Sequence, residues 1–222
     1  MLPEAVIFDM DGLMFDTERL SSQAWQAAGK RMGVNLTEAV ISRFRGTTPQ
    51  VSRRVCLEVF GPSFDYTAAR AMRTQFLEQA IRDRGLPVKP GLKDLLSTLS
   101  DCGIPAAVAS SSPLKTIRWY LSLAEITSFF QVIVSGEEAA RSKPDPDCFL
   151  LAASRLQKAP VSCLVLEDSE NGLRAAQAAG MRSICIPDLS LPAPVILART
   201  EAVLPSLAEV WSWLQSVPSD HR

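Results

Sequence analysis

The chain has 222 residues, of which 47% are hydrophobic and 21% are charged, with a formal net charge of −1. It is therefore long enough for a core with a smaller inserted domain, and it has the composition of a globular protein. The small net charge excludes a broad electrostatic contact with nucleic acid or an anionic membrane. Because no signal-peptide pattern and no apolar window of membrane-spanning length occurs, we expect a cytoplasmic protein that binds no membrane.

The first predicted element is a buried strand over residues 5–8, a short apolar run that ends at Asp9. Asp11 follows two residues later. Residues two apart in an extended chain point the same way, so both carboxylates can face one pocket. The alternative is that Asp-x-Asp-Gly forms only a solvated turn.

Residues 17–86 show helical patterns and no convincing strand, and a turn-rich junction follows them at 85–91. A helical insert between the first and second strands is the simplest explanation. We therefore expect a helical domain over 17–86 and a core formed by 1–16 and 87–222.

The remainder of the chain alternates between strand and helix patterns. Apolar runs predict strands at 104–109, 132–134, 163–166 and 183–186, and an i, i+3, i+4, i+7 spacing predicts helices over 92–99 and 207–214. This alternation predicts an α/β fold with a Rossmann-like, mainly parallel sheet. Ligands of such sheets bind beyond the carboxyl ends of the strands.

Three serines follow the predicted strand 104–109. Ser110, Ser111 and Ser112 precede Pro113, which we expect to be the first residue of a helix. Hydroxyls and free backbone N–H groups at a helix start are suited to binding a phosphate oxygen. Ser112 alone has the position of a helix N-cap.

Lys143 lies in a stiff loop, because the following proline keeps it out of helical geometry. Asp145 and Pro146 are expected to be the N-cap and first turn of the next helix. A lysine fixed in such a loop can neutralise a phosphate or an attacking carboxylate, although a single lysine is more often part of the solvated surface.

Glu167 and Asp168 follow the predicted strand 163–166. If this strand and 5–8 are parallel in one sheet, these acids converge with Asp9 and Asp11. Carboxylates gathered in this way repel one another unless protons or a cation intervene. Since only oxygen ligands are available, Mg²⁺ is the natural candidate. Glu-Asp before a helix is also a common capping sequence.

Histidine and cysteine restrict the chemistry further. The only histidine is His221, next to the end of the chain. Histidine general bases and almost all catalytic zinc sites are therefore excluded. The five cysteines form no C-x-x-C pair and are expected to be reduced thiols.

In this order, the motifs resemble those of the haloacid dehalogenase superfamily over nearly the whole chain. Phe8–Thr17 is similar to the first motif of that superfamily, Ser110 to the second, Lys143 to the third and Glu167–Ser169 to the fourth. The insert resembles the small helical cap of the subgroup that contains sugar phosphatases and β-phosphoglucomutase. Asn171–Gly172 fits that subgroup too.

The resemblance implies roles for the acidic residues. Asp9 would be the nucleophile that accepts the phosphoryl group, and Asp11 would protonate the leaving oxygen and then deprotonate water. The backbone carbonyl of Asp11 would hold Mg²⁺ together with Asp9 and Asp168. Glu167 would contribute to the metal site directly or through water.

The resemblance also implies where phosphate and substrate bind. Ser110, Ser111 and Lys143 would bind the transferring phosphoryl group, whose charge makes electrostatic positioning the main catalytic need. Thr17 would mark the hinge of the cap, and Arg45 and Gly46 would belong to its substrate loop.

The expected function is a Mg²⁺-dependent phosphatase that hydrolyses a small phosphorylated metabolite, a sugar or polyol phosphate, as a monomer. Dehalogenases of the superfamily lack an acid two residues after the nucleophile, so Asp11 favours phosphoryl transfer. The first alternative is a β-phosphoglucomutase-type mutase. Mutases resembling this chain carry a histidine where it has Ser21 and an arginine where it has Pro49, although Arg45 could substitute in part. The second is an inactive phosphate-binding regulatory protein.

Overall fold

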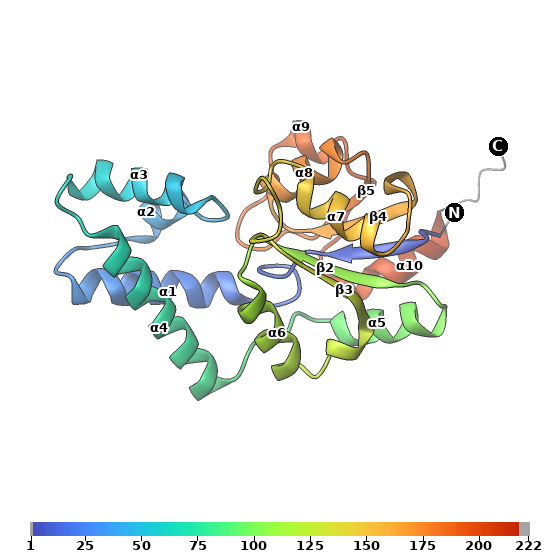
Figure 1. Cartoon of the computed structure of the whole chain (residues 1–222), viewed down its shortest axis with the longest axis horizontal. Helices are drawn as coiled ribbons and strands as arrows, with labels where there is room; N and C mark the ends of the chain where they lie inside the picture. Colours follow the sequence, from blue (N-terminus) through green and yellow to red (C-terminus); the bar gives the residue numbers. More distant parts are fainter. Residues whose placement is uncertain (1, 218–222) are drawn as a thin grey trace. The chain divides into compact units, whose positions relative to one another are not determined.

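The structure is a computed structural model that describes residues 2–217, so His221 lies outside the described residues. The chain forms two compact units. The first contains the described residues up to Asp16 and those from Pro87 onward, and the second is Thr17–Leu86 (Figure 1). Within residues 2–217, no helix is long and apolar enough to cross a membrane.

The first unit is built on a six-stranded sheet in which every strand pair is parallel. The strands are β1 (Ala5–Phe8), β2 (Ala106–Ser110), β3 (Phe130–Ser135), β4 (Cys163–Glu167), β5 (Arg182–Cys185) and β6 (Ala202–Val203). Their order is β3-β2-β1-β4-β5-β6, so the chain reverses its direction across the sheet between β1 and β4. This is a doubly wound sheet, and ligands of such sheets bind at the point of reversal. The predicted α/β fold is confirmed.

Helices cover both faces of the sheet, which explains why β1, β2 and β4 consist of buried residues throughout. On one face, α7 (Asp147–Arg155) and α8 (Glu170–Ala178) pack against side chains of β1, β2 and β4 in a shared core cluster. The opposite face carries α5 (Leu92–Asp101), α6 (Leu114–Leu123) and α10 (Val210–Ser216) (Figure 1). The shorter elements are α9 (Pro194–Leu197) and the 3₁₀ turns η1 (Thr127–Phe129), η2 (Pro160–Ser162) and η3 (Leu207–Glu209).

Two helices begin one residue or more later than the sequence pattern predicts. Pro113 is the N-cap of α6 rather than its first residue, and Ser112 donates its hydroxyl to Asp11 instead of capping the helix. α7 begins at Asp147 with Pro146 as its N-cap. At both helix starts a proline holds the N-cap position in place of the side chain expected there, since Ser112 bonds to Asp11 and Asp145 pairs with Arg141.

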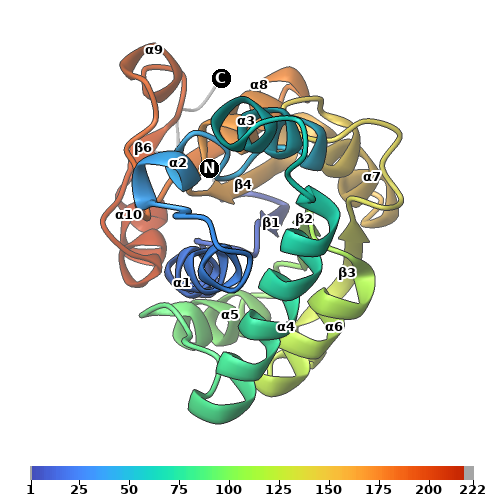
Figure 2. The same cartoon turned by 90° about the vertical axis from the view of Figure 1, so that its left-hand side faces the viewer.

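The second unit is helical in all of its regular structure, and Figure 2 shows its helices from the front. They are α1 (Thr17–Arg31), α2 (Glu38–Ser42), α3 (Pro49–Phe60) and α4 (Tyr66–Arg84). The unit has its own core, in which the ring of Trp25 lies 5.4 Å from that of Phe44 and 6.0 Å from that of Tyr66. Buried aromatic rings in such contacts stabilise a small core beyond their buried area.

Candidate active site

A buried lysine and two carboxylates form the centre of the site at the carboxyl ends of β1 and β4. Lys143 Nζ lies 2.5 Å from Asp9 Oδ1 and 2.7 Å from Glu167 Oε1. The register pairs Phe8 with Leu166, so the residues that follow them are neighbours across adjacent strands. All three side chains are buried. An ammonium held by two carboxylates in this way is a fixed positive charge at the end of the sheet.

Glu167 is anchored on its other side by the start of α8. Its Oε2 accepts hydrogen bonds from the N–H groups of Asp168 at 2.9 Å and Ser169 at 2.8 Å, and from Ser169 Oγ at 2.9 Å. A Cβ on Gly172 would lie 1.6 Å from Glu167 Oε1, so only glycine admits this carboxylate. Both oxygens of Glu167 thus have protein partners, and its side chain holds Lys143 in place.

Gly172→Ala is expected to displace Glu167 and to lower the free energy of unfolding by about 2 kcal/mol, the usual cost of overpacking a buried site. Urea unfolding measures this change. Arg174→Ala is the matched control, because Arg174 forms an exposed pair with Glu170 in the same helix. Its effect should stay within about 0.5 kcal/mol. Wild-type stability for Gly172→Ala would contradict the close approach of Glu167.

The electrostatics of the site favour an additional positive charge. Burial raises the pKa of Asp9, and the charges of Glu167 and Asp11 add to this effect, while Lys143 opposes it. Burial lowers the pKa of Lys143, but the charges of Asp9 and Glu167 outweigh burial and raise it above its ordinary value. One ammonium therefore faces several carboxylates, an arrangement that a cation stabilises.

Three carboxyl groups lie close enough together to hold a metal ion. Each of Asp9, Glu167 and Asp168 offers an oxygen, and these oxygens lie within 4.8 Å of one another. Gly12 has a φ of +88°, a backbone conformation that favours glycine, and a Cβ there would lie 2.3 Å from Asp168 Oδ2. Both the backbone conformation and the close approach therefore require glycine at this position. A donor set made only of oxygens fits Mg²⁺. Both oxygens of Glu167 already accept hydrogen bonds, from Lys143 and from the start of α8, which disfavours a direct bond from Glu167 to a metal.

The serines after β2 divide into three environments. Ser110 is 1% exposed, and its Oγ accepts a hydrogen bond from the N–H of Ser112 at 3.0 Å. Ser111 is exposed. Ser112 Oγ donates to Asp11 Oδ2 at 2.7 Å. The sequence pattern had identified Ser112 only as a helix cap. The position of Ser112 at the end of a run of three serines, directly after a predicted strand, was the feature of the sequence that could have identified it as a site residue.

The residues expected to form the hinge and substrate loop lie in the helical unit. Thr17 is buried and begins α1, and Gly46 is exposed with a φ of +64°. Arg45 donates from Nη2 to Ser22 Oγ at 2.9 Å and also to Glu38. Its Nε lies 3.6 Å from Glu18 Oε2. The charge of Arg45 is thus balanced by two carboxylates in this arrangement.

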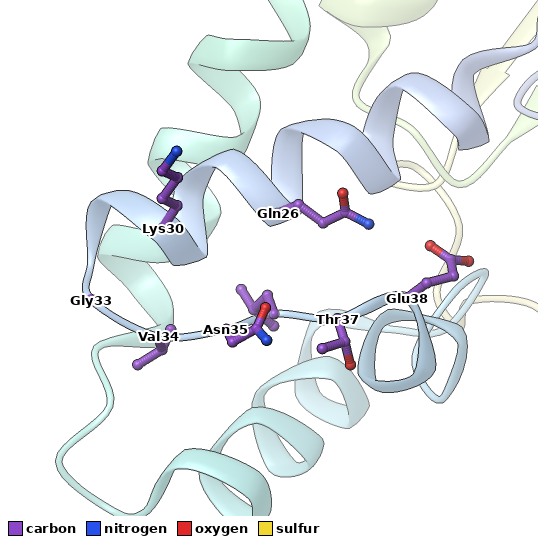
Figure 3. A pocket seen from close by; sticks show the side chains of 8 residues that line it. Gln26, Lys30, Gly33, Val34, Asn35, Thr37 and Glu38 are labelled. Carbon is purple, nitrogen blue, oxygen red and sulfur yellow. The ribbon is translucent and has the colours of Figure 1, made fainter.

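A hollow on the helical unit lies between α1 and the segment that follows it (Figure 3). Its lining includes Gln26 and Lys30 from α1, and Asn35, Thr37 and Glu38 from the following segment. No residue expected from the sequence to take part in catalysis or phosphate binding lines it. The hollow is therefore separate from the carboxylate cluster.

A doubly wound sheet that gathers acids and a lysine at its point of reversal has the arrangement typical of α/β enzymes, in which ligands bind beyond the carboxyl ends of the strands. The particular family follows from comparison with known proteins. Residues 6–186 match the family described as haloacid dehalogenase-like hydrolases, and the chain belongs to this family. The resemblance drawn from the motifs is confirmed.

Relatives include both phosphatases and mutases. A phosphorylated carbohydrates phosphatase from Thermotoga maritima is 30% identical over 181 residues, 82% of this chain and 83% of that protein. The β-phosphoglucomutase of Bacillus subtilis is 29% identical over 219 residues, 94% of this chain and 95% of that protein. The crystal structure of CbbY from Rhodobacter sphaeroides in complex with phosphate has a TM-score of 0.78 and 26% identity, covering 94% of this chain and 96% of that one.

Proposed function

We propose that this chain is a Mg²⁺-dependent phosphatase that hydrolyses a small phosphorylated metabolite, a sugar or polyol phosphate. The observation that carries the proposal is the Asp9 carboxylate, placed at the carboxyl end of β1 and bonded at Oδ1 to a buried lysine. With Oδ1 bonded to Lys143, Asp9 Oδ2 is the oxygen that would attack phosphorus. The relative named a phosphorylated carbohydrates phosphatase supports the substrate class.

The proposed reaction has two steps. In the first, Asp9 Oδ2 forms a bond to phosphorus, the ester P–O bond breaks, and Asp11 gives its proton to the leaving oxygen. In the second, Asp11 takes a proton from water, the water oxygen bonds to phosphorus, and the acyl phosphate bond breaks to restore the Asp9 carboxylate. Asp11 is then protonated again and Asp9 is a free carboxylate, as at the start, and inorganic phosphate is released.

The other residues position and neutralise the transferring group. Lys143 supplies positive charge beside Asp9. Ser110 Oγ accepts a hydrogen bond from the N–H of Ser112, so the hydroxyl proton of Ser110 can be donated to a phosphate oxygen. Ser111 would contribute from the exposed edge of the same turn. Mg²⁺, held by Asp9, Asp168 and the backbone carbonyl of Asp11, would supply the positive charge that stabilises the phosphoryl oxygens. Glu167 would act through Lys143 or through water.

Mutase activity is the second candidate, and the Bacillus subtilis relative favours it. A mutase must grip a second phosphate and exclude water while its intermediate reorients. In the helical unit, Ser21 Oγ accepts from Arg73 Nε at 3.2 Å and from Arg73 Nη2 at 2.5 Å. Arg45, the substitute clamp, is occupied by Glu18 and Glu38. These contacts support the phosphatase over the mutase.

The deciding experiment follows both products at once. With β-glucose 1-phosphate and other hexose phosphates, release of inorganic phosphate is expected to dominate, and isomerisation to glucose 6-phosphate to be negligible, with or without glucose 1,6-bisphosphate as primer. In the proposed second step Asp11 activates water, so the intermediate should be hydrolysed. Primed isomerisation that exceeds phosphate release tenfold would favour the mutase instead, and Arg45→Ala would then test the clamp.

A simpler assay distinguishes an active enzyme from the other alternative, an inactive phosphate-binding regulatory protein. Release of phosphate from an aryl phosphate that depends on Mg²⁺ would exclude it. We also propose that the enzyme acts as a monomer in the cytoplasm. The carboxylate cluster is complete within one chain, and all five cysteines are free thiols.

A further inference from the structure

Ser112 joins the ends of three strands through three hydrogen bonds. Its N–H donates to Ser110 Oγ at the end of β2 at 3.0 Å, and its carbonyl accepts from Ser135 Oγ at the end of β3 at 2.9 Å. Its own Oγ donates to Asp11 Oδ2, beyond the end of β1, at 2.7 Å. Ser110 and Ser135 are buried, so Ser112 is fixed by the sheet itself.

Because the hydroxyl of Ser112 bonds to Asp11, it does not cap the helix that follows. α6 begins two residues later with a proline N-cap and has no side-chain cap hydrogen bond. Serine at such a position ordinarily caps the helix. A serine that bonds to a residue 101 positions away in the sequence, instead of capping the adjacent helix, indicates a functional constraint.

We propose that Ser112 is a positioning residue that holds Asp11 for proton transfer to the leaving group, which rests on the proposed function. A hydrogen bond accepted by Oδ2 fixes the plane of the carboxyl group. Proton transfer requires a heavy-atom separation of about 2.6–3.2 Å to the leaving oxygen, so loss of this orientation slows the step that needs the acid.

The test compares phosphate monoesters whose leaving groups differ in basicity. An alkyl phosphate needs a proton on its leaving oxygen, whereas 2,4-dinitrophenyl phosphate does not. The ratio kcat/KM reports the phosphoryl-transfer step for both. Ser112→Ala is expected to lower kcat/KM for the alkyl ester by about 10- to 100-fold, part of the usual contribution of a general acid. For the dinitrophenyl ester the loss should be less than about threefold.

Two variants act as references. Ser112→Thr keeps the hydroxyl and should restore kcat/KM for the alkyl ester to within about threefold of wild type. Ser122→Ala removes an exposed serine from α6 and should change neither substrate. Thermal unfolding of Ser112→Ala and Ser112→Thr confirms that both are folded at the assay temperature.

A double variant shows whether Ser112 acts through Asp11. Asp11→Asn alone should affect the alkyl ester far more than the dinitrophenyl ester, and adding Ser112→Ala should cause no further loss beyond about twofold. Equal losses on both esters for Ser112→Ala, or none on the alkyl ester, would overturn the role of Ser112 alone. Equal losses for Asp11→Asn would show instead that Asp11 is not the acid, and both proposals would then fail.

Discussion

Asp9→Asn is expected to lower kcat for phosphate release by about 10⁴-fold or more while the protein remains folded. Asparagine has nearly the same shape as aspartate, but its amide is a far poorer nucleophile, and removal of a covalent catalyst costs several orders of magnitude. Single-turnover release of inorganic phosphate measures the effect. A variant that retains a tenth of the wild-type kcat would show that another group attacks phosphorus.

The fold should survive this change because Lys143 keeps other partners. Its Nζ lies 2.7 Å from Glu167 Oε1, and the amide oxygen of asparagine can still accept a hydrogen bond. The Tm of Asp9→Asn is therefore expected to stay close to that of wild type. Asp101→Asn, at the exposed end of α5, is the control for the substitution itself and should retain full activity.

Removing Mg²⁺ is expected to reduce activity by about 100-fold or more, since the metal supplies much of the charge stabilisation in phosphoryl transfer. Protein dialysed against a chelator should lose phosphate release and regain it with Mg²⁺. Ca²⁺ should not restore it, because its larger and looser coordination shell misplaces the phosphoryl group. Full activity of metal-free protein would contradict the proposed site.

A binding measurement tests the metal site without turnover. Mg²⁺ that binds the folded state raises Tm in a concentration-dependent way. Asp168→Asn should abolish this rise, because Asp168 is one of the three clustered carboxylates. Asp101→Asn should leave it intact. An unchanged Mg²⁺ response in Asp168→Asn would place the ion elsewhere.

Local patterns in the sequence were sufficient for the sheet and for the residues at its edge. Apolar runs predicted all strands except β6, whose two residues are too short to form a recognisable run. Parallel strands bring their carboxyl ends to one edge, so the meeting of Asp9 with Glu167 and Asp168 was expected on the condition that their strands are parallel in one sheet, and the structure meets that condition. These features depend on side-chain alternation and connection rules that a sequence carries directly.

Only the tertiary structure decided what each polar group bonds to. Ser112 donates its hydroxyl to Asp11 instead of capping the helix that follows, and Arg45 pairs with two acids of its own unit. Glu167 serves as an anchor for Lys143 because Gly172 allows it to approach α8. At Ser112 the choice is a competition between a local helix cap and a hydrogen bond to a residue 101 positions away. A local stretch of sequence contains just one of the two competitors, whereas the folded chain contains both.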